Sequence, residues 1–269
     1  MNIDDWLRQS QRQLTVAGIE TARLDCLVLL EDYLNKNRTQ LLAHPELEIT
    51  VEQQKYLWKC VERRTKHEPL AYIRGKVEFY GREFIVDKHV LVPRPESEAI
   101  IELLKAKAAD LPDHPRIADV GTGSGVLGIT AKLELPNAQV DLFEVDQAAL
   151  DVAQKNINKF SMFLDCFLGD LLATANTLYD VVITNLPYVP NGFSINRAAQ
   201  VEPRLAIFGG ADGLDLYRRL FAQLQTLSQK PSVVLTESLP QQHADLAEIA
   251  RNVGFKLAKT EDFIQQFVA

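Results

Sequence analysis

The residues Asn185-Leu186-Pro187-Tyr188 follow the apolar stretch "DVVIT" directly and combine an amide, a proline and an aromatic ring. The side-chain oxygen of Asn185 and the carbonyl oxygen of Leu186 can each accept one hydrogen bond, and a planar NH2 group has two hydrogens to donate. Pro187 restricts Leu186 to an extended conformation, and Tyr188 offers an aromatic face beside both acceptors. The pattern therefore predicts a site that holds a planar NH2 group. The alternative is that the proline only ends a buried strand.

An NH2 group held in this way is suited to receive a small electrophilic group. An amide nitrogen is a poor nucleophile because its lone pair is delocalised. Fixed carbonyl acceptors pull on its hydrogens and stabilise the positive charge that develops during attack. Holding the reacting atoms about 3–3.5 Å apart lowers the barrier by several kcal/mol. This chemistry requires neither a metal nor a catalytic histidine, and the five histidines are scattered along the chain.

A glycine-rich loop, "DVGTGSGVLG", stands between a predicted strand and a predicted helix. Its glycines permit positive φ angles and close approach of the backbone to a ligand, and we expect free N–H groups at the start of the helix to face that ligand. The loop is not a dinucleotide fingerprint, because Val126 stands where the third glycine belongs, and it lacks the Gly-Lys-Ser/Thr of a P-loop. A purely structural tight turn is the alternative. The glycines are Gly121, Gly123 and Gly125.

Acidic residues follow two later segments. Asp146 ends "LFEVD", where an acid can accept the hydrogens of two ribose hydroxyl groups. Glu144 shares its face in a regular strand, but Asp146 is preferred because it stands at the expected strand end. The alternative for Asp146 is a helix cap. Further along, Asp170 can accept hydrogens of an adenine amino group while Leu171 packs on the ring, and the alternative is capping of a short turn.

The elements around these residues form an N-terminal helical part and a later alternation of strands and helices. Residues 21–34 and 50–67 have helical periodicity, with Thr50 at an N-cap position, and residues 75–92 resemble a β-hairpin around Gly81. The alternation after residue 116 predicts parallel strands with helices on both faces, and ligands of such sheets bind beyond the carboxyl ends of the strands. The strands expected from this alternation are 116–121, 139–146, 179–185, 232–238, 255–262 and 264–268.

Composition and charge exclude several classes of protein. The 269 residues carry a net charge of −7, and residues 1–75 are balanced with 11 basic and 11 acidic residues, which argues against tight nucleic-acid binding. The first residues lack the apolar core of a signal peptide, and no apolar run reaches roughly 18 residues, so we expect no membrane segment. Cys26, Cys60 and Cys166 fit neither a zinc site nor a disulfide framework, which favours a cytoplasmic protein.

Ordered motifs cover almost the whole chain. They are "ARLDCLVLL", "RTQLLAHPE", "PLAYIRGKVEFYGREF", "VLVPRPESE", "DVGTGSG", "EVDQAAL", "ITNLPYVP" and "EPRLAIFGGADGLDLYRRL". With these motifs the chain resembles the release-factor glutamine N5-methyltransferase family (PrmC/HemK) of class I S-adenosylmethionine-dependent methyltransferases. The resemblance implies an α/β fold with a doubly wound, mostly parallel, seven-stranded Rossmann-like sheet. It also implies a helical substrate-recognition domain at residues 1–74, a β-hairpin linker at 75–95 and a methyltransferase domain at 96–269.

The same resemblance implies the reaction. A methyl group would pass from S-adenosylmethionine to the side-chain amide of the glutamine in the Gly-Gly-Gln motif of peptide-chain release factors, leaving S-adenosylhomocysteine. We expect a monomer without a metal, and without nucleic-acid or membrane partners. The residues Asn185, Leu186, Pro187 and Tyr188 would hold the glutamine. The residues that would contact S-adenosylmethionine are Gly121, Thr122, Gly123, Ser124, Gly125, Asp146, Asp170, Leu171 and Asn185.

Two residues depart from the family pattern. Leu186 replaces the first proline of the usual Asn-Pro-Pro-Tyr, but the backbone carbonyl assigned to this position is supplied by any residue, so we expect activity to survive. Leu171 stands where some relatives carry an aromatic residue near adenine, which predicts weaker cofactor binding.

Two other functions are compatible with parts of the sequence. Asn-Leu-Pro-Tyr also resembles the motif of rRNA adenine-N6 dimethyltransferases, in which a flipped base would stack on Tyr188, so an adenine-N6 methyltransferase of RNA or DNA is the enzymatic alternative. The charge balance and the stretches "PLAYIRG" and "GGADGLD" argue against it. A nucleoside-binding scaffold without catalysis is the second alternative, and the motif at 185–188 argues against that function.

Replacement of Asn185 tests the predicted site. We expect Asn185→Ala to abolish methyl transfer and to leave the fold intact, because the change removes one acceptor for the NH2 group and no large apolar contact. Turnover with labelled S-adenosylmethionine, together with circular dichroism, measures both. Turnover at the wild-type rate in this variant would contradict the mechanism.

Overall fold

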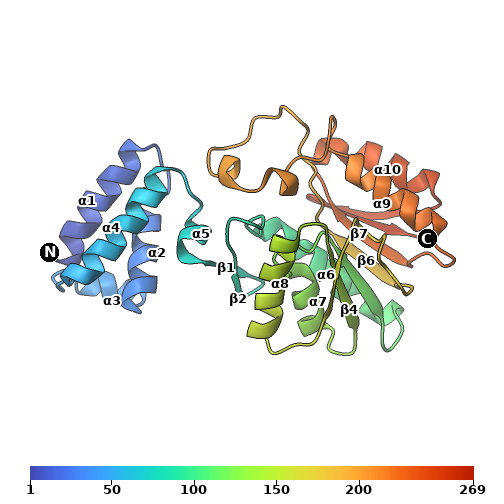
Figure 1. Ribbon diagram of the computed structural model, residues 1–269, viewed down its shortest axis with the longest axis horizontal. Helices are drawn as coiled ribbons and strands as arrows, with labels where there is room; N and C mark the ends of the chain where they lie inside the picture. The colour runs from blue at the N-terminus through green and yellow to red at the C-terminus, as the bar shows by residue number, and fades with distance from the viewer. The chain divides into compact units, whose positions relative to one another are not determined.

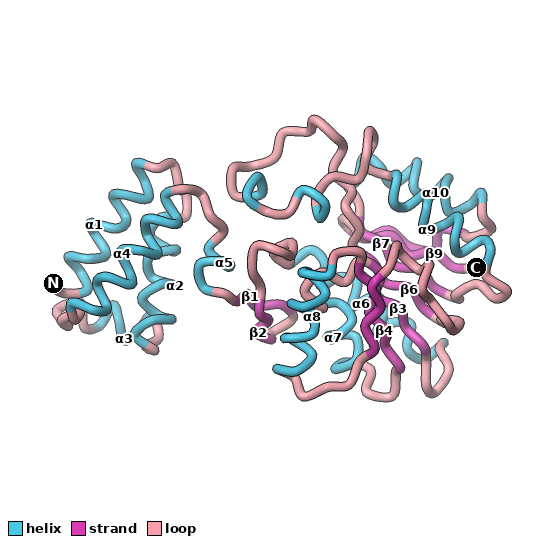
Figure 2. The backbone as a smooth tube through the Cα atoms, in the orientation of Figure 1, coloured by secondary structure: helices cyan, strands magenta, loops and turns pink.

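The computed structural model describes residues 1–269, which form two compact units (Figure 1). The first unit comprises Met1–Gly75 together with Asn196–Val201, and the second comprises Lys76–Ile195 together with Glu202–Ala269. The first unit is helical, and the second contains all the strands (Figure 2). None of the ten α-helices has both the length and the apolar character of a membrane span.

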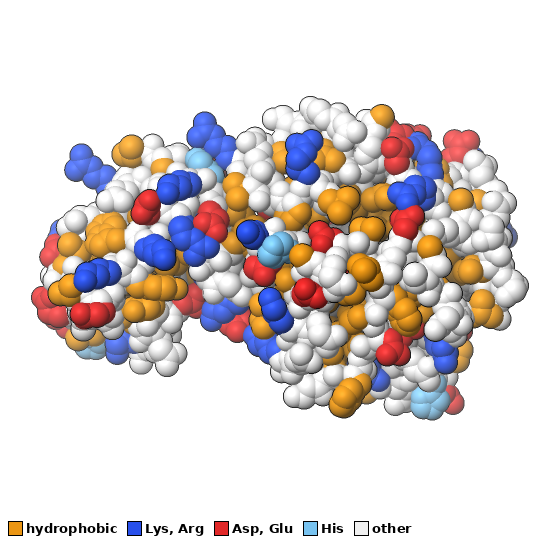
Figure 3. Space-filling view, viewed as in Figure 1, with side chains coloured by type: hydrophobic (Ala, Val, Ile, Leu, Met, Phe, Trp, Pro, Cys, Tyr) orange, Lys and Arg blue, Asp and Glu red, His pale blue; other side chains and the backbone are white.

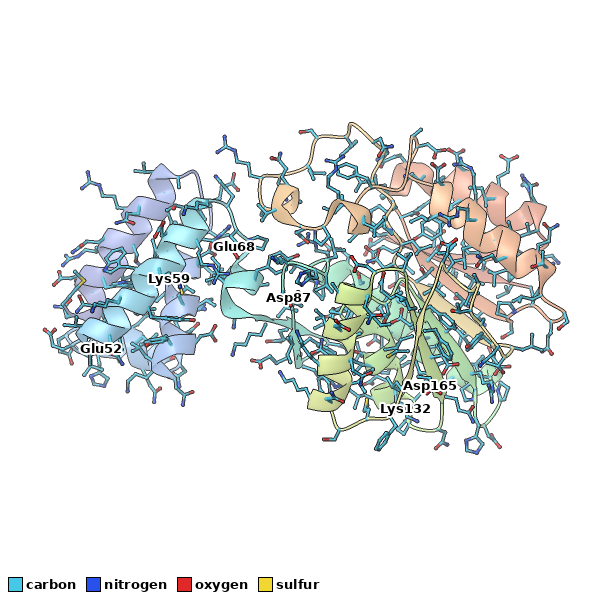
Figure 4. All side chains as sticks on the ribbon, in the orientation of Figure 1. Glu52, Lys59, Glu68, Asp87, Lys132 and Asp165 are labelled. Atoms are coloured by element: carbon cyan, nitrogen blue, oxygen red, sulfur yellow. The ribbon has the colours of Figure 1, made fainter.

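The first unit is a small bundle of five helices around an apolar core. Thr50 and Gln53 form a reciprocal capping box at the start of the fourth helix, which confirms the predicted N-cap. Trp6 is completely buried, and an ion pair of 2.7 Å between Arg64 Nε and Asp25 Oδ2 lies almost fully buried beside the core. The helices are α1 (Ile3–Val16), α2 (Ala22–Leu34), α3 (Arg38–Ala43), α4 (Val51–Thr65) and α5 (Leu70–Arg74). Figure 4 shows Glu52 and Lys59 projecting from α4.

The second unit begins with a hairpin and continues into a seven-stranded sheet. The sheet order is β5-β4-β3-β6-β7-β9-β8, and only β9 runs antiparallel to its neighbours, so the predicted doubly wound, mostly parallel sheet is confirmed. The hairpin strands are β1 (Lys76–Phe79) and β2 (Arg82–Ile85). The sheet strands are β3 (Arg116–Val120), β4 (Gln139–Glu144), β5 (Asp165–Leu168), β6 (Val181–Thr184), β7 (Val233–Glu237), β8 (Lys256–Glu261) and β9 (Ile264–Val268).

Helices cover both faces of the sheet (Figure 1). The helices α6, α7 and α8 pack with one face in a first apolar cluster, and α9 and α10 pack with the other face in a second cluster. These helices are α6 (Glu98–Lys107), α7 (Val126–Glu134), α8 (Gln147–Lys159), α9 (Asp215–Thr226) and α10 (His243–Asn252). Lys132 closes the turn between α7 and β4 by donating from Nζ to the carbonyl oxygens of Pro136 and Ala138, both at 2.8 Å (Figure 4).

Two details differ from the strands expected from the sequence. The alternation of strands and helices did not single out β5, because this edge strand is four residues long and none of its side chains is fully buried. The strand β4 ends at Glu144, so Asp146 lies outside it and forms the N-cap of α8.

Asn156 of α8 joins the hairpin to the glycine-rich loop. Its buried side chain accepts from Ile85 N at 2.7 Å, and Nδ2 donates to Ile85 O at 2.9 Å and to Ser124 O at 2.8 Å. One side chain thus satisfies three backbone groups of two separate segments. Buried backbone groups that lose their partners destabilise the folded state, so this contact fixes the loop against α8.

Replacement of Asn156 tests this contact. We expect Asn156→Ala to lower the free energy of unfolding by about 2–4 kcal/mol, because it leaves three buried backbone groups without partners. Asn158→Ala on the exposed face of the same helix is the control and should change stability by less than about 0.5 kcal/mol. Urea unfolding measures both variants, and equal stabilities would show that Asn156 does not hold the loop.

Candidate active site

The carboxyl ends of β3, β4 and β6 border a pocket of about 300 Å³. In the parallel register Val120 pairs with Phe143 and with Thr184, and Thr184 pairs with Thr236. The residues that follow these four lie in one row across the edge of the sheet. They are Glu144, Gly121, Asn185 and Glu237. Most of the site residues expected from the sequence line this pocket. They are Gly121, Thr122, Gly123, Ser124, Asp146, Asp170, Leu171, Asn185, Leu186 and Pro187. Gly125 and Tyr188 lie outside the lining.

The glycine-rich loop uses several of its amides within the protein. Gly121 N and Thr122 N both donate to Phe143 O, at 2.9 and 3.0 Å, and Gly123 N donates to Glu144 Oε2 at 2.9 Å. These three N–H groups of the loop are therefore not free for a ligand. The glycines at 121, 123 and 125 have φ angles of 74°, 54° and 84°, so the loop curves through the left-handed region. A Cβ atom at Gly123 would meet no other atom within 4 Å, which leaves open space beside the backbone.

Glu144, the last residue of β4, is the acid that lies against this loop. Besides the Gly123 amide, its carboxylate accepts from Val145 N at 2.9 Å and Asp146 N at 3.2 Å. Burial raises the pKa of Glu144, and the three backbone donors act in the opposite direction. Asp146 accepts from Ala148 N at 2.8 Å and caps α8, while its residue still borders the pocket. A ribose contact of Asp146 stays a prediction.

A second buried carboxyl, Asp119, supports the loop from below. Its Oδ2 atom accepts from Thr122 Oγ1 at 2.6 Å and from Gly128 N at 2.8 Å. Burial raises the pKa of Asp119 to about 7, and these two hydrogen bonds oppose the shift. A Cβ atom at Gly128 would lie 2.2 Å from Leu142 Cδ2 and 2.9 Å from Asp119 Oδ2, so the start of α7 requires a residue without a side chain there.

Asn185 belongs to a chain of hydrogen bonds that the sequence did not reveal. Its Nδ2 donates to Ser97 Oγ at 2.9 Å, and Ser97 Oγ donates to Glu237 Oε2 at 2.6 Å. Tyr188 donates from its hydroxyl group to Glu237 Oε1 at 2.9 Å. Ser97 ends the short 3-10 helix before α6, and Glu237 is the buried last residue of β7. The one signal in the sequence was a glutamate that ends the otherwise uncharged strand "VVLTE".

The backbone of Pro187 and Tyr188 is held by the loop at residues 209–213. Gln242 Nε2 donates to Tyr188 O at 2.8 Å and to Asp212 O at 2.7 Å, which joins the two loops. A Cβ atom at Gly213 would lie only 2.0 Å from Tyr188 O, so the close approach requires glycine. The stretch "GGADGLD" therefore shapes the position of the predicted amide-holding residues.

Leu186, the departure from the family pattern, packs against the glycine-rich loop. Its side chain is buried, and its Cδ2 atom lies 2.8 Å from the place that a Cβ atom at Gly121 would occupy. The leucine therefore links the loops that follow β3 and β6 through an apolar contact.

Asp170 and Leu171 lie in a turn held by α9. The Asp170 carboxylate pairs with Arg219 on the exposed rim, and Gln223 accepts from Leu172 N at 2.9 Å and donates to Asp170 O at 3.2 Å. Leu171 is buried with a φ angle of 54°. An adenine contact of Asp170 stays a prediction, and the carboxylate would share its lone pairs with Arg219.

Comparisons with known proteins cover both units. Residues 5–75 match the model of the PrmC N-terminal domain, and residues 95–201 match that of the methyltransferase small domain. A release factor glutamine methyltransferase of Deinococcus radiodurans is 32% identical over 95% of this chain and 92% of its own. One of Moorella thermoacetica is 34% identical over 94% and 91%. The structure of a methyltransferase from Pyrococcus furiosus resembles this fold with a TM-score of 0.52, covering 70% of this chain and 88% of that chain at 17% identity.

Two glycine replacements test the contact between the loops. Gly213 and Gly192 have nearly the same φ, 83° and 84°, but a Cβ atom at Gly192 would meet no other atom. We expect Gly192→Ala to cost about 1–2 kcal/mol for the left-handed backbone alone. Gly213→Ala should cost at least about 2 kcal/mol more, because the Tyr188 backbone must move. Urea unfolding of both variants measures the difference, and equal losses would rule out the contact.

Proposed function

The chain belongs to the release factor glutamine methyltransferase family, and from this we propose that it methylates the glutamine of the Gly-Gly-Gln motif in peptide-chain release factors. The methyl donor is S-adenosylmethionine, and the acceptor is the side-chain amide nitrogen (N5). The proposal places the enzyme in the cytoplasm, where translation factors act.

The residues that line the pocket support binding of S-adenosylmethionine. The open space beside Gly123 admits a ligand close to the backbone, and Asp146, which also lines the pocket, offers carboxylate oxygens for ribose hydroxyl groups. Between the two acids expected at this strand end, the geometry favours Asp146, because its carboxylate accepts one backbone amide, whereas the Glu144 carboxylate already accepts three. Leu171 and Phe143 provide apolar lining for adenine. When bound, S-adenosylmethionine supplies an electrophilic methyl group.

The observation that carries the proposal is the fixed orientation of Asn185 at the pocket. Because Nδ2 is bound to Ser97, the amide presents Oδ1 as the acceptor for a substrate NH2 group. The Leu186 carbonyl is the second acceptor of the proposal, and Pro187 keeps it rigid. The Tyr188 ring, anchored to Glu237, would flank the substrate plane.

These residues favour transfer to nitrogen in two ways. Two acceptors orient the glutamine nitrogen toward the methyl group and stabilise the charge that nitrogen gains. The new bond forms between nitrogen and the methyl carbon as the bond from carbon to sulfur breaks. Nitrogen then loses one of its two hydrogens as a proton to solvent. No side chain needs to act as a nucleophile.

An adenine amino group offers the same two hydrogens, so a nucleic-acid substrate is the function to exclude. On the face shown in Figure 3, basic and acidic side chains are interspersed within each unit rather than gathered into a basic field. Together with the net charge of −7, this distribution supports a protein substrate.

The test uses methyl-labelled S-adenosylmethionine with three acceptors. These are a purified release factor, its Gln-to-Ala variant in the Gly-Gly-Gln motif, and ribosomal RNA. We expect label on the unaltered factor alone, because only this acceptor carries the glutamine amide. Label on RNA alone would overturn the proposed substrate and indicate that residues 185–188 hold a base.

A further inference from the structure

The buried carboxylate of Glu237 accepts hydrogen bonds on both oxygens. Ser97 Oγ donates to Oε2 at 2.6 Å, and the Tyr188 hydroxyl donates to Oε1 at 2.9 Å. The side chain of Glu237 is only about 1% exposed. An ionised carboxylate can accept hydrogen bonds but cannot donate one, so both neighbouring hydroxyl groups must point their hydrogens at it.

This arrangement fixes the direction of the next hydrogen bond. The hydroxyl group of Ser97 has one hydrogen, and that hydrogen is committed to Glu237. Toward Asn185, Ser97 can therefore only accept, so Asn185 must turn its NH2 side to Ser97, as the Nδ2–Oγ distance of 2.9 Å shows. The oxygen of Asn185 is then the atom left for a substrate.

We propose that Glu237 is a positioning residue that, through Ser97, sets the Asn185 amide with its oxygen toward the substrate. With the amide reversed, an NH2 group would face the NH2 group of the substrate, and two donors repel each other. The same carboxylate anchors the Tyr188 ring, so one buried charge orients both polar and aromatic parts of the site. This inference rests on the proposed function in one respect, which is that the substrate receiving the methyl group carries a planar NH2 group.

The proposal predicts a dependence on pH. Burial raises the pKa of Glu237, and the hydrogen bonds from its neighbours oppose this rise. As the pH falls through this pKa, the carboxyl gains a proton and no longer needs the Ser97 hydrogen, so Asn185 can reverse and the rate falls. Three titratable groups face Glu237, namely Glu96, Tyr188 and Tyr217. The negative charge of Glu96 raises the pKa of Glu237 further. The positive charge of Arg94 lowers the pKa of Tyr188.

The first variant is Glu237→Gln, which keeps the shape and replaces one acceptor by an NH2 donor. With the introduced oxygen facing Tyr188, the introduced NH2 group faces Ser97, whose hydrogen must then point at Asn185 and reverse it. We expect kcat to fall about 10- to 100-fold, because a change of this size corresponds to the loss of one good hydrogen bond in the transition state. Binding of S-adenosylhomocysteine should stay within about threefold of wild type. The control is Glu96→Gln, which removes a neighbouring charge without touching this chain of hydrogen bonds, and it should keep the wild-type rate.

The decisive variant is the double replacement Ser97→Ala with Glu237→Gln. Ser97→Ala alone frees the Asn185 amide to adopt either orientation, so kcat should fall only a few-fold. The double variant should have the rate of Ser97→Ala, which means that removing Ser97 restores part of the activity lost in Glu237→Gln. A purely structural role of Glu237 predicts a double variant that is at least as impaired as Glu237→Gln.

Three outcomes would overturn the proposal. They are a wild-type rate in Glu237→Gln, a double variant no more active than Glu237→Gln, and a Ser97→Ala variant with unchanged kcat. Thermal unfolding shows whether Glu237→Gln folds. If it does not, kcat of Ser97→Ala alone still tests the proposal. Failure of the proposed function is distinct, because the wild-type enzyme would then label RNA and not the release factor. The same variants would be measured on that RNA, since an adenine amine needs the same acceptors.

Discussion

The parallel register of four neighbouring strands is the constraint on which the site depends. Parallel strands end at the same edge of a sheet, so residues far apart in the sequence meet there. The pairs between β3 and its neighbours place Val120 beside Phe143 and Thr184, and the next pair places Thr184 beside Thr236. The residues one step further form a single row across the edge. This row contains Glu144, Gly121, Asn185 and Glu237.

Two buried carboxyl groups, Asp119 and Glu237, and the partly buried Glu144 lie at this edge, and each orients neighbouring groups. Asp119 holds the glycine-rich loop, Glu144 accepts three backbone amides beside it, and Glu237 accepts two hydroxyl groups behind Asn185. Removing a carboxylate from water is unfavourable, and each of the three groups accepts hydrogen bonds on at least one oxygen. The result is a set of acceptors and donors whose directions are fixed before a substrate binds, which is the arrangement that favours transfer to a weak nucleophile.

Close backbone contacts complete this rigidity. The loop at 209–213 lies against the carbonyl groups of Pro187 and Tyr188, and Gln242 bridges the two loops. Leu186 lacks the ring that would stiffen the backbone, but its buried side chain packs on the loop at Gly121. Packing from neighbouring segments thus replaces part of the local rigidity of a second proline.

The sequence by itself determined the fold class and the two motifs of the site. Periodicity and the alternation of apolar runs are local properties, so they predicted the mostly parallel sheet, and they missed only β5, which has four residues and no fully buried side chain. The sequence also placed the glycine-rich loop and residues 185–188 at strand ends. Only the tertiary structure decided which groups meet. Ser97 lies 88 residues from Asn185 and 140 from Glu237, so no local pattern joins them. Strand pairing also decides three further details, because register and burial rather than residue type set the hydrogen-bond partners. These details are the end of β4 at Glu144, the N-cap at Asp146 and the loop amides that donate to carbonyl and carboxylate groups of the protein.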